Sequence, residues 1–102
     1  MYTLVDMSTS PVTNKSINIR DIIHFNGGPA HKIVSVLATG TFTGTPKLTI
    51  SQDGTNFAPL LNEDDDQIEL EAEKMVFLDW ANIYLKVDLT DVTSSDLKVT
   101  IQ

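Results

Sequence analysis

The chain has 102 residues, of which 41% are hydrophobic, and it contains no cysteine. This length fits one domain with a single core, and the lack of thiols excludes disulfides and cysteine-bound metal sites. The formal net charge is −7, with +2 in residues 1–50 and −9 in residues 51–102, so the chain lacks the basic surface that nucleic-acid binding requires.

The first fifteen residues, "MYTLVDMSTSPVTNK", show little periodicity. They have no basic region ahead of a long apolar run, so they do not resemble a secretion signal, and no window of the chain is apolar enough to span a membrane. We expect residues 1–15 to form an N-terminal arm, followed by a single domain over residues 16–102. In this arm, Tyr2, Leu4 and Val5 are candidate anchors for a neighbouring subunit or for a surface that the protein decorates.

Three strands are predicted in the next part of the chain. The segment "SINI" places Ile17 and Ile19 on one face, and "KLTIS" does the same with Leu48 and Ile50. Between them, "HKIVSVLATGTF" is apolar on both faces from Ile33 to Leu37, which is typical of a central strand.

Alternation is clearest in the second half, in "DQIELEAE", "NIYLKVDLT" and "DLKVTIQ". The period of two predicts half-buried strands whose inward residues are Ile68, Leu70, Ala72, Ile83, Leu85, Val87, Leu89, Leu97, Val99 and Ile101. The segment "EKMVFLDWA" is ambiguous between a strand and a bend. We expect the last strand, "LKVTIQ", to belong to a sheet and to leave an open edge.

Turn signals separate these runs at "NGGP", "TGTP", "QDGTN", "NEDDD" and "TSSD", and no sustained helical period occurs. Short alternating strands between regular turns predict an all-β fold. The expected architecture is an antiparallel β-sandwich, jelly-roll-like, with about eight short strands.

Asp53 and Gly54 are the strongest local turn signal. Glycine adopts positive φ at no steric cost, and an aspartate can accept hydrogen bonds from the backbone two residues on. The favoured interpretation is a structural turn between two strands. The functional alternative is the tip of a sugar-binding or partner-binding loop.

Other candidate sites have a simpler explanation. Glu63 to Asp66 form an acidic run that could hold a hard cation, but consecutive residues of an extended segment point to alternate sides, so a solvated loop is favoured. His24 and His31 lack a third close ligand for zinc and are interpreted as surface residues. Asp79 beside Trp80 could be an acid next to a stacking ring, but Trp80 is interpreted as a core residue. With no nucleophile elbow and no cysteine, we expect no enzyme activity and no cofactor.

A resemblance rests on three motifs of residues 34–102. They are Gly40-x-Phe42-x-Gly44, then Ser51-x-Asp53-Gly54 with Phe57, and finally Tyr84-x-Lys86-Val87 followed by the strand Leu97, Val99, Ile101. Together they resemble the small β-sandwich structural proteins of tailed-phage virions, which include head-decoration proteins, head fibres and tail or baseplate accessory modules. The second motif also occurs in galactose-binding-like jelly rolls.

The resemblance implies a non-catalytic virion protein, made in the host cytoplasm, that acts by assembly. Its partners would be further copies of itself, with a trimer weakly preferred, and other virion proteins such as the major capsid or tail protein. The alternative is a carbohydrate-binding or host-surface-binding module. No nucleic acid or membrane partner is expected, and the sequence shows no basic or aromatic cluster that would hold a glycan.

Overall fold

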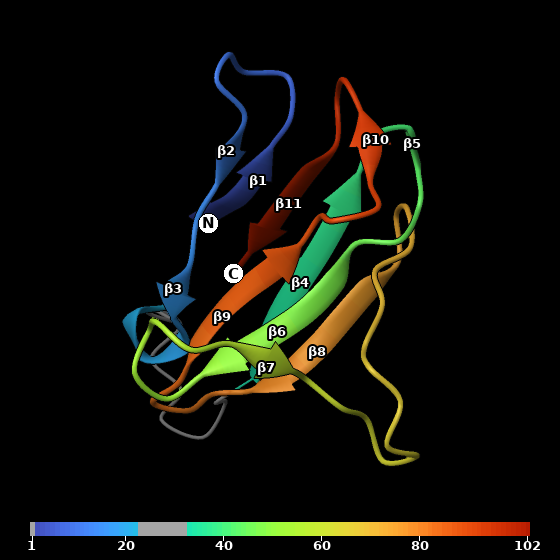
Figure 1. Ribbon diagram of the computed structural model, residues 1–102. Coiled ribbons are helices and arrows are strands. Elements are labelled where there is room, and N and C mark those ends of the chain that lie inside the picture. Colours follow the sequence, from blue (N-terminus) through green and yellow to red (C-terminus); the bar gives the residue numbers. More distant parts are fainter. Residues whose placement is uncertain (1, 23–32) are drawn as a thin grey trace.

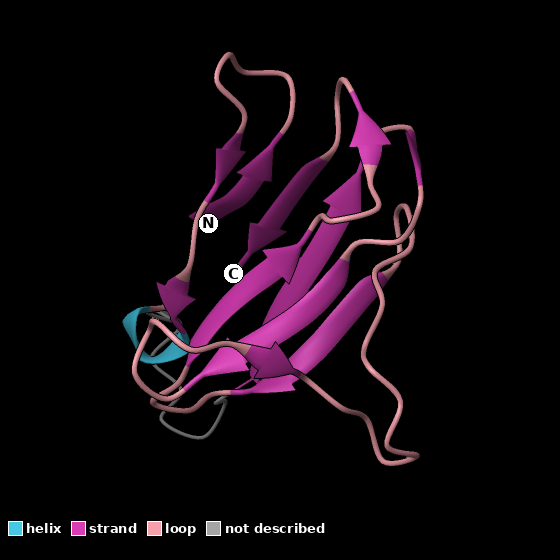
Figure 2. Cartoon of the chain, in the orientation of Figure 1, coloured by secondary structure: helices cyan, strands magenta, loops and turns pink. Residues whose placement is uncertain are grey.

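Two antiparallel sheets pack face to face in the computed structural model, which describes residues 2–22 and 33–102 (Figures 1 and 2). The five-stranded sheet has the order β2-β1-β11-β4-β8, formed by Thr13–Asn14, Tyr2–Asp6, Lys98–Ile101, Ile33–Thr39 and Met75–Asp79. The four-stranded sheet has the order β3-β9-β6-β7, formed by Ile17–Asn18, Tyr84–Asp88, Lys47–Ser51 and Ala58–Pro59. The predicted all-β sandwich is therefore confirmed. His24, His31 and the turn signal at 26–29 lie outside the described residues.

From β4 onward, the longer strands alternate between the two sheets. Strands β4, β8 and β11 belong to the five-stranded sheet, and β6 and β9 belong to the four-stranded sheet. Two of the crossings contain short strands, β5 (Phe42–Thr43) and β10 (Thr93–Ser94), which pair with each other at one end of the sandwich (Figure 1). A 3-10 turn, η1 (Ile19–Asp21), follows β3. The described residues contain eleven strands rather than about eight, because two-residue strands are too short to show alternation.

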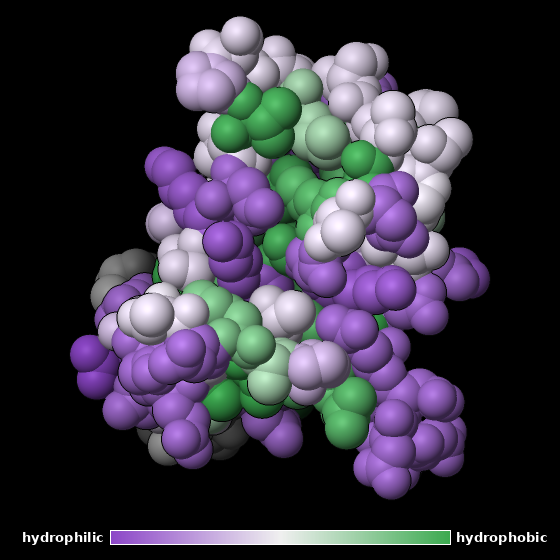
Figure 3. All heavy atoms as spheres, in the orientation of Figure 1, coloured by the Kyte–Doolittle hydropathy of each residue, from purple (hydrophilic) through white to green (hydrophobic). Residues whose placement is uncertain are grey.

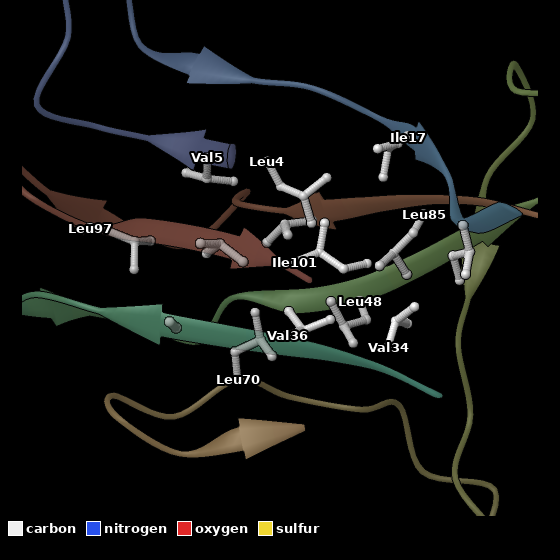
Figure 4. Close-up of a cluster of buried hydrophobic side chains, with 14 residues drawn as sticks. Leu4, Val5, Ile17, Val34, Val36, Leu48, Leu70, Leu85, Leu97 and Ile101 are labelled. Atoms are coloured by element: carbon white, nitrogen blue, oxygen red, sulfur yellow. The ribbon is translucent and has the colours of Figure 1, made fainter. Parts of the chain in front are cut away.

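The core lies between the sheets, where side chains from both point toward one another (Figure 4). Inward residues of β4, β6, β9 and β11 alternate with exposed or half-buried ones, as predicted for the last two. Among the described residues, fourteen hydrophobic residues are buried: Leu4, Val5, Ile17, Ile19, Val34, Val36, Ala38, Leu48, Leu70, Leu85, Val87, Leu97, Val99 and Ile101. Burial of each large side chain stabilises the fold by about 1.5–3 kcal/mol.

The prediction of an N-terminal arm over residues 1–15 is wrong. Residues Tyr2–Asp6 form β1, which pairs with both β11 and β2 inside the five-stranded sheet. The register shifts between Thr3 and Val5, and this bulge turns two consecutive residues, Leu4 and Val5, into the core with no exposed surface. Tyr2 is half-buried and packs against that core. Leu4 and Val5 therefore belong to the core and are not available as anchors for another subunit, whereas Tyr2 keeps part of its surface exposed.

The segment 66–73 is less regular than its alternation predicts. Leu70 is buried and Ile68 packs against the core, but Ala72 is exposed, and only isolated bridges join the segment to Lys47 of β6 and Ala38 of β4. It crosses from one sheet to the other, so it cannot follow the edge of either for its whole length. The ambiguous segment 73–81 contains the edge strand β8.

The expectation of an open edge at the last strand is also wrong. Strand β11 lies between β1 and β4, so its backbone is paired on both sides. Among the described residues, the sheet edges are β2 and β8 in one layer and β3 and β7 in the other. Among the described residues, association through an edge of either of these two layers would use one of these four strands.

Candidate functional site

The loop at residues 52–57 is a structural turn. It joins β6 to β7, which pair with Thr49 opposite Pro59 and Ile50 opposite Ala58. Gly54 has φ +79°, so the predicted positive φ is confirmed. The Asp53 carboxylate accepts hydrogen bonds from the Thr55 and Asn56 amides at 2.9 Å and from the Ser51 hydroxyl at 2.8 Å. Every one of these contacts stays inside the loop.

These hydrogen bonds hold the pKa of Asp53 well below its usual range, chiefly through the amides of Asn56 and Thr55. A depressed folded-state pKa contributes stability above the unfolded value, about 3.9, and this contribution is lost as the pH falls through the folded value. We expect Asp53→Asn to be less stable than the wild type at pH 7, with the difference shrinking below about pH 4. Urea unfolding at several pH values measures it. A difference that does not change with pH would show that the charge of Asp53 is not what stabilises the turn.

The second and third motifs of the resemblance meet on the outer face of β6 and β9. An ideal Cβ built at Gly54 would lie 3.4 Å from the Tyr84 ring, so the backbone of the turn packs against this aromatic side chain. Close by, the Lys86 ammonium lies 5.9 Å from the centre of the Phe57 ring. The second and third motifs are therefore parts of one packed surface.

The first motif closes the end of the sandwich where β5 and β10 pair. Gly40 and Gly44 have φ +101° and +82°, and each approaches a backbone carbonyl of the other crossing. A Cβ at Gly40 would lie 2.6 Å from the Asp96 oxygen, and one at Gly44 would lie 2.0 Å from the Asp91 oxygen. Between them, Phe42 packs against the core. The Gly-x-Phe-x-Gly spacing thus holds the two crossings together.

The acidic run forms an exposed loop. Leu61 pairs with Gln67 at its base, and the Asn62 side chain accepts hydrogen bonds from the amides of Asp64 and Asp66. The loop protrudes from the sandwich as a hydrophilic tip (Figure 3). Among the described residues, no group of three His, Cys, Asp or Glu side chains is arranged to hold a metal ion. The same part of the chain contains no helix long and apolar enough to cross a membrane.

A shallow recess on the outer face of the four-stranded sheet is the place where the carbohydrate alternative would act. It offers one aromatic ring, Phe57, and is otherwise lined by Asn14, Thr49, Lys86, Val87, Asp88, Leu89 and Thr90. Sugar sites pair an aromatic platform with several convergent polar groups. Here the ring is half-buried and its neighbour Lys86 is close enough for a cation–π contact.

An exposed apolar surface lies on the outer face of β4 and β8. Phe77 is 65% exposed, Ile33 51% and Met75 49%. The three side chains share this face because Ser35 pairs with Phe77, Leu37 with Met75, and Ile33 with Asp79. The sequence did not predict this surface. Apolar residues on both faces of residues 33–37 predicted a central strand, and β4 is central, between β11 and β8.

A groove opens next to this surface, between β7 and β8. Its volume is about 610 Å³, and its lining includes Leu60 and Leu61, which follow β7, and Phe77, Leu78 and Asp79 of β8. Hydrophobic surface beside the hydrophilic 62–66 loop is visible in Figure 3.

No protein-family model, curated protein or solved structure matches the chain.

Proposed function

We propose that the chain is a non-catalytic structural protein of a tailed-phage virion, of the head-decoration, head-fibre or tail-accessory type, that acts by assembly. The observation that carries the proposal is the apolar outer face of β4 and β8, where Ile33, Met75 and Phe77 are each about half exposed or more. Exposed apolar surface on an edge strand favours association with another protein chain.

The motifs support the same proposal. Gly40, Gly44 and Gly54 occupy positions where the backbone of the sandwich turns or crosses, and Asp53 uses its carboxylate within its own loop. These residues therefore serve the turns and close contacts of the fold, as expected for a module that acts by assembly. A module of this kind would be made in the host cytoplasm and would reach the particle by binding its other proteins.

Self-association through the outer face is the first expected result. We expect light scattering to give an oligomer, a trimer by preference, for the wild type. The double variant Ile33→Ser, Met75→Ser should be monomeric, because it removes apolar surface that solvent reaches in the single chain. Val12→Ser is the matched control, since Val12 is 47% exposed but lies beside β2, at the opposite edge of the same sheet. A wild type that stays monomeric would remove self-association from the proposal.

Mass spectrometry of purified phage particles tests the function itself. The chain should be found in every particle in many copies, and the wild type should show no binding on a glycan array. Absence from particles together with specific glycan binding would instead establish the carbohydrate-binding alternative.

A further inference from the structure

The groove between β7 and β8 has an apolar floor. The groove lies where the chain leaves β7 and, further along, where it leaves β8 (Figure 1). Its floor is formed by residues from both sheets and from the segments that join them, namely Ile19, Ile50, Ile68, Leu78 and Ile83. A volume of about 610 Å³ is enough to hold several apolar side chains.

The β8 side of the groove is a strand edge, whereas on the other side the backbone of Leu60 is hydrogen-bonded to Leu48 and Ile68. Among the described residues, β7 ends the four-stranded sheet and β8 ends the five-stranded sheet. The outer edge of a strand presents unpaired N–H and C=O groups, which an extended segment of another chain can pair with. In such a segment, alternate side chains would point into the groove and the others toward solvent.

The charge around the groove has one sign. Of the described residues that line it, Glu63 and Asp79 are charged and both are acidic. Glu63 also begins the acidic run that continues through Asp66. A second copy of this chain, with a net charge of −7, would bring more negative charge to this rim. Charge complementarity therefore favours a basic segment from a different protein.

We propose that this groove binds an extended segment of another protein, with apolar side chains at alternate positions and lysine or arginine at its ends. The segment adds a strand along β8, places its apolar side chains over Leu78 and Ile83, and pairs its basic ends with Glu63 and Asp79. Docking of this kind rests on the proposed function, because it is the means by which a structural module would attach to its virion partner.

Two labelled heptapeptides test the proposal by fluorescence anisotropy with the full chain. Both carry valine at three alternate positions with threonine between them, and they differ only in having lysine or glutamate at the two ends. At low salt, we expect the lysine peptide to bind roughly tenfold more tightly than the glutamate peptide, which corresponds to two favourable surface charge pairs. This preference should shrink in high salt because surface charges are then screened.

Two variants with matched controls locate the site. Leu61→Ser, at a position 49% exposed on the groove rim, should weaken binding of the lysine peptide, whereas Val12→Ser, at a position 47% exposed, should not. Asp79→Lys should reduce or reverse the preference between the peptides. Asp91→Lys makes the same charge change between β9 and β10, outside the groove lining, and should preserve it. Thermal melts of all four variants check that they fold.

Several results would overturn the proposal. The first is that neither peptide binds, and the second is that both bind with equal affinity. The third is that Leu61→Ser and Val12→Ser change the affinity equally. The fourth is that the wild type self-assembles and light scattering shows that Leu61→Ser dissociates it. The last result would make a second copy the occupant. Peptide binding by a chain that is absent from particles would overturn the proposed function and still support the groove as a docking site.

Discussion

Replacing Gly44 by alanine is expected to destabilise the domain by about 2–5 kcal/mol. At φ +82°, the backbone conformation is unfavourable by roughly 1–2 kcal/mol for any residue with a Cβ. In addition, the new Cβ would lie 2.0 Å from the carbonyl oxygen of Asp91, and backbone atoms cannot rotate away as a side chain can. The crossing from β4 to β6 must then move apart from the crossing from β9 to β11. Urea unfolding, analysed as the free energy of unfolding in water, measures the loss.

Gly54→Ala is the matched control. Gly54 has nearly the same φ, +79°, but its Cβ would meet only the Tyr84 ring at 3.4 Å, an ordinary van der Waals distance. It should therefore lose only the conformational part, about 1–2 kcal/mol. Equal losses in the two variants would mean that the close approach to Asp91 is absent in solution.

The strands that could be predicted from the sequence are those with one face on the core and one in solvent. Residues 84–88 and 98–101 alternate because each strand pairs with regular partners and lies flat on the core. The hairpin at Asp53 and Gly54 was predictable for a related reason. Its stabilising hydrogen bonds are local, so the residue types alone specify them.

The strand at residues 2–6 could not be predicted in this way. Its bulge buries Leu4 and Val5 together, and a bulge is set by the partner strand β11, almost a hundred residues later in the chain. The pairing of β5 with β10 is similarly non-local, and each strand has only two residues. The signal for it was present in the spacing of Gly40 and Gly44, but its physical reason lies in the carbonyls of Asp96 and Asp91.

The apolar face was hidden for a different reason. In "MVFLD" and "KIVSVL" apolar residues occupy both faces, as they do in a strand covered on both sides. Only the strand order shows that β8 is an edge and that Phe77, Met75 and Ile33 face outward. A strand that is apolar on both faces therefore need not have both faces buried within its own chain.

Removal of residues 1–14 is expected to abolish cooperative folding. The deletion removes Leu4 and Val5 from the core, at about 1.5–3 kcal/mol each, together with the strand that pairs with β11. It also exposes one edge of β11, a strand whose inward residues Val99 and Ile101 have no exposed surface in the intact domain. A loss of this size is comparable with the whole stability of a small domain, about 5–15 kcal/mol.

Two single substitutions test whether the effect of the deletion comes from the lost core side chains or from the shortened chain. Leu4→Asp places a charge in the core and should abolish the thermal transition seen by circular dichroism, whereas Thr3→Asp, at the half-buried neighbouring position, should keep it. If residues 1–15 instead formed an arm that joins subunits, the deletion would give a folded monomer with an unchanged melt, and both substitutions would be tolerated. The side chains of β1 decide between these outcomes because they complete a core that no other described segment fills.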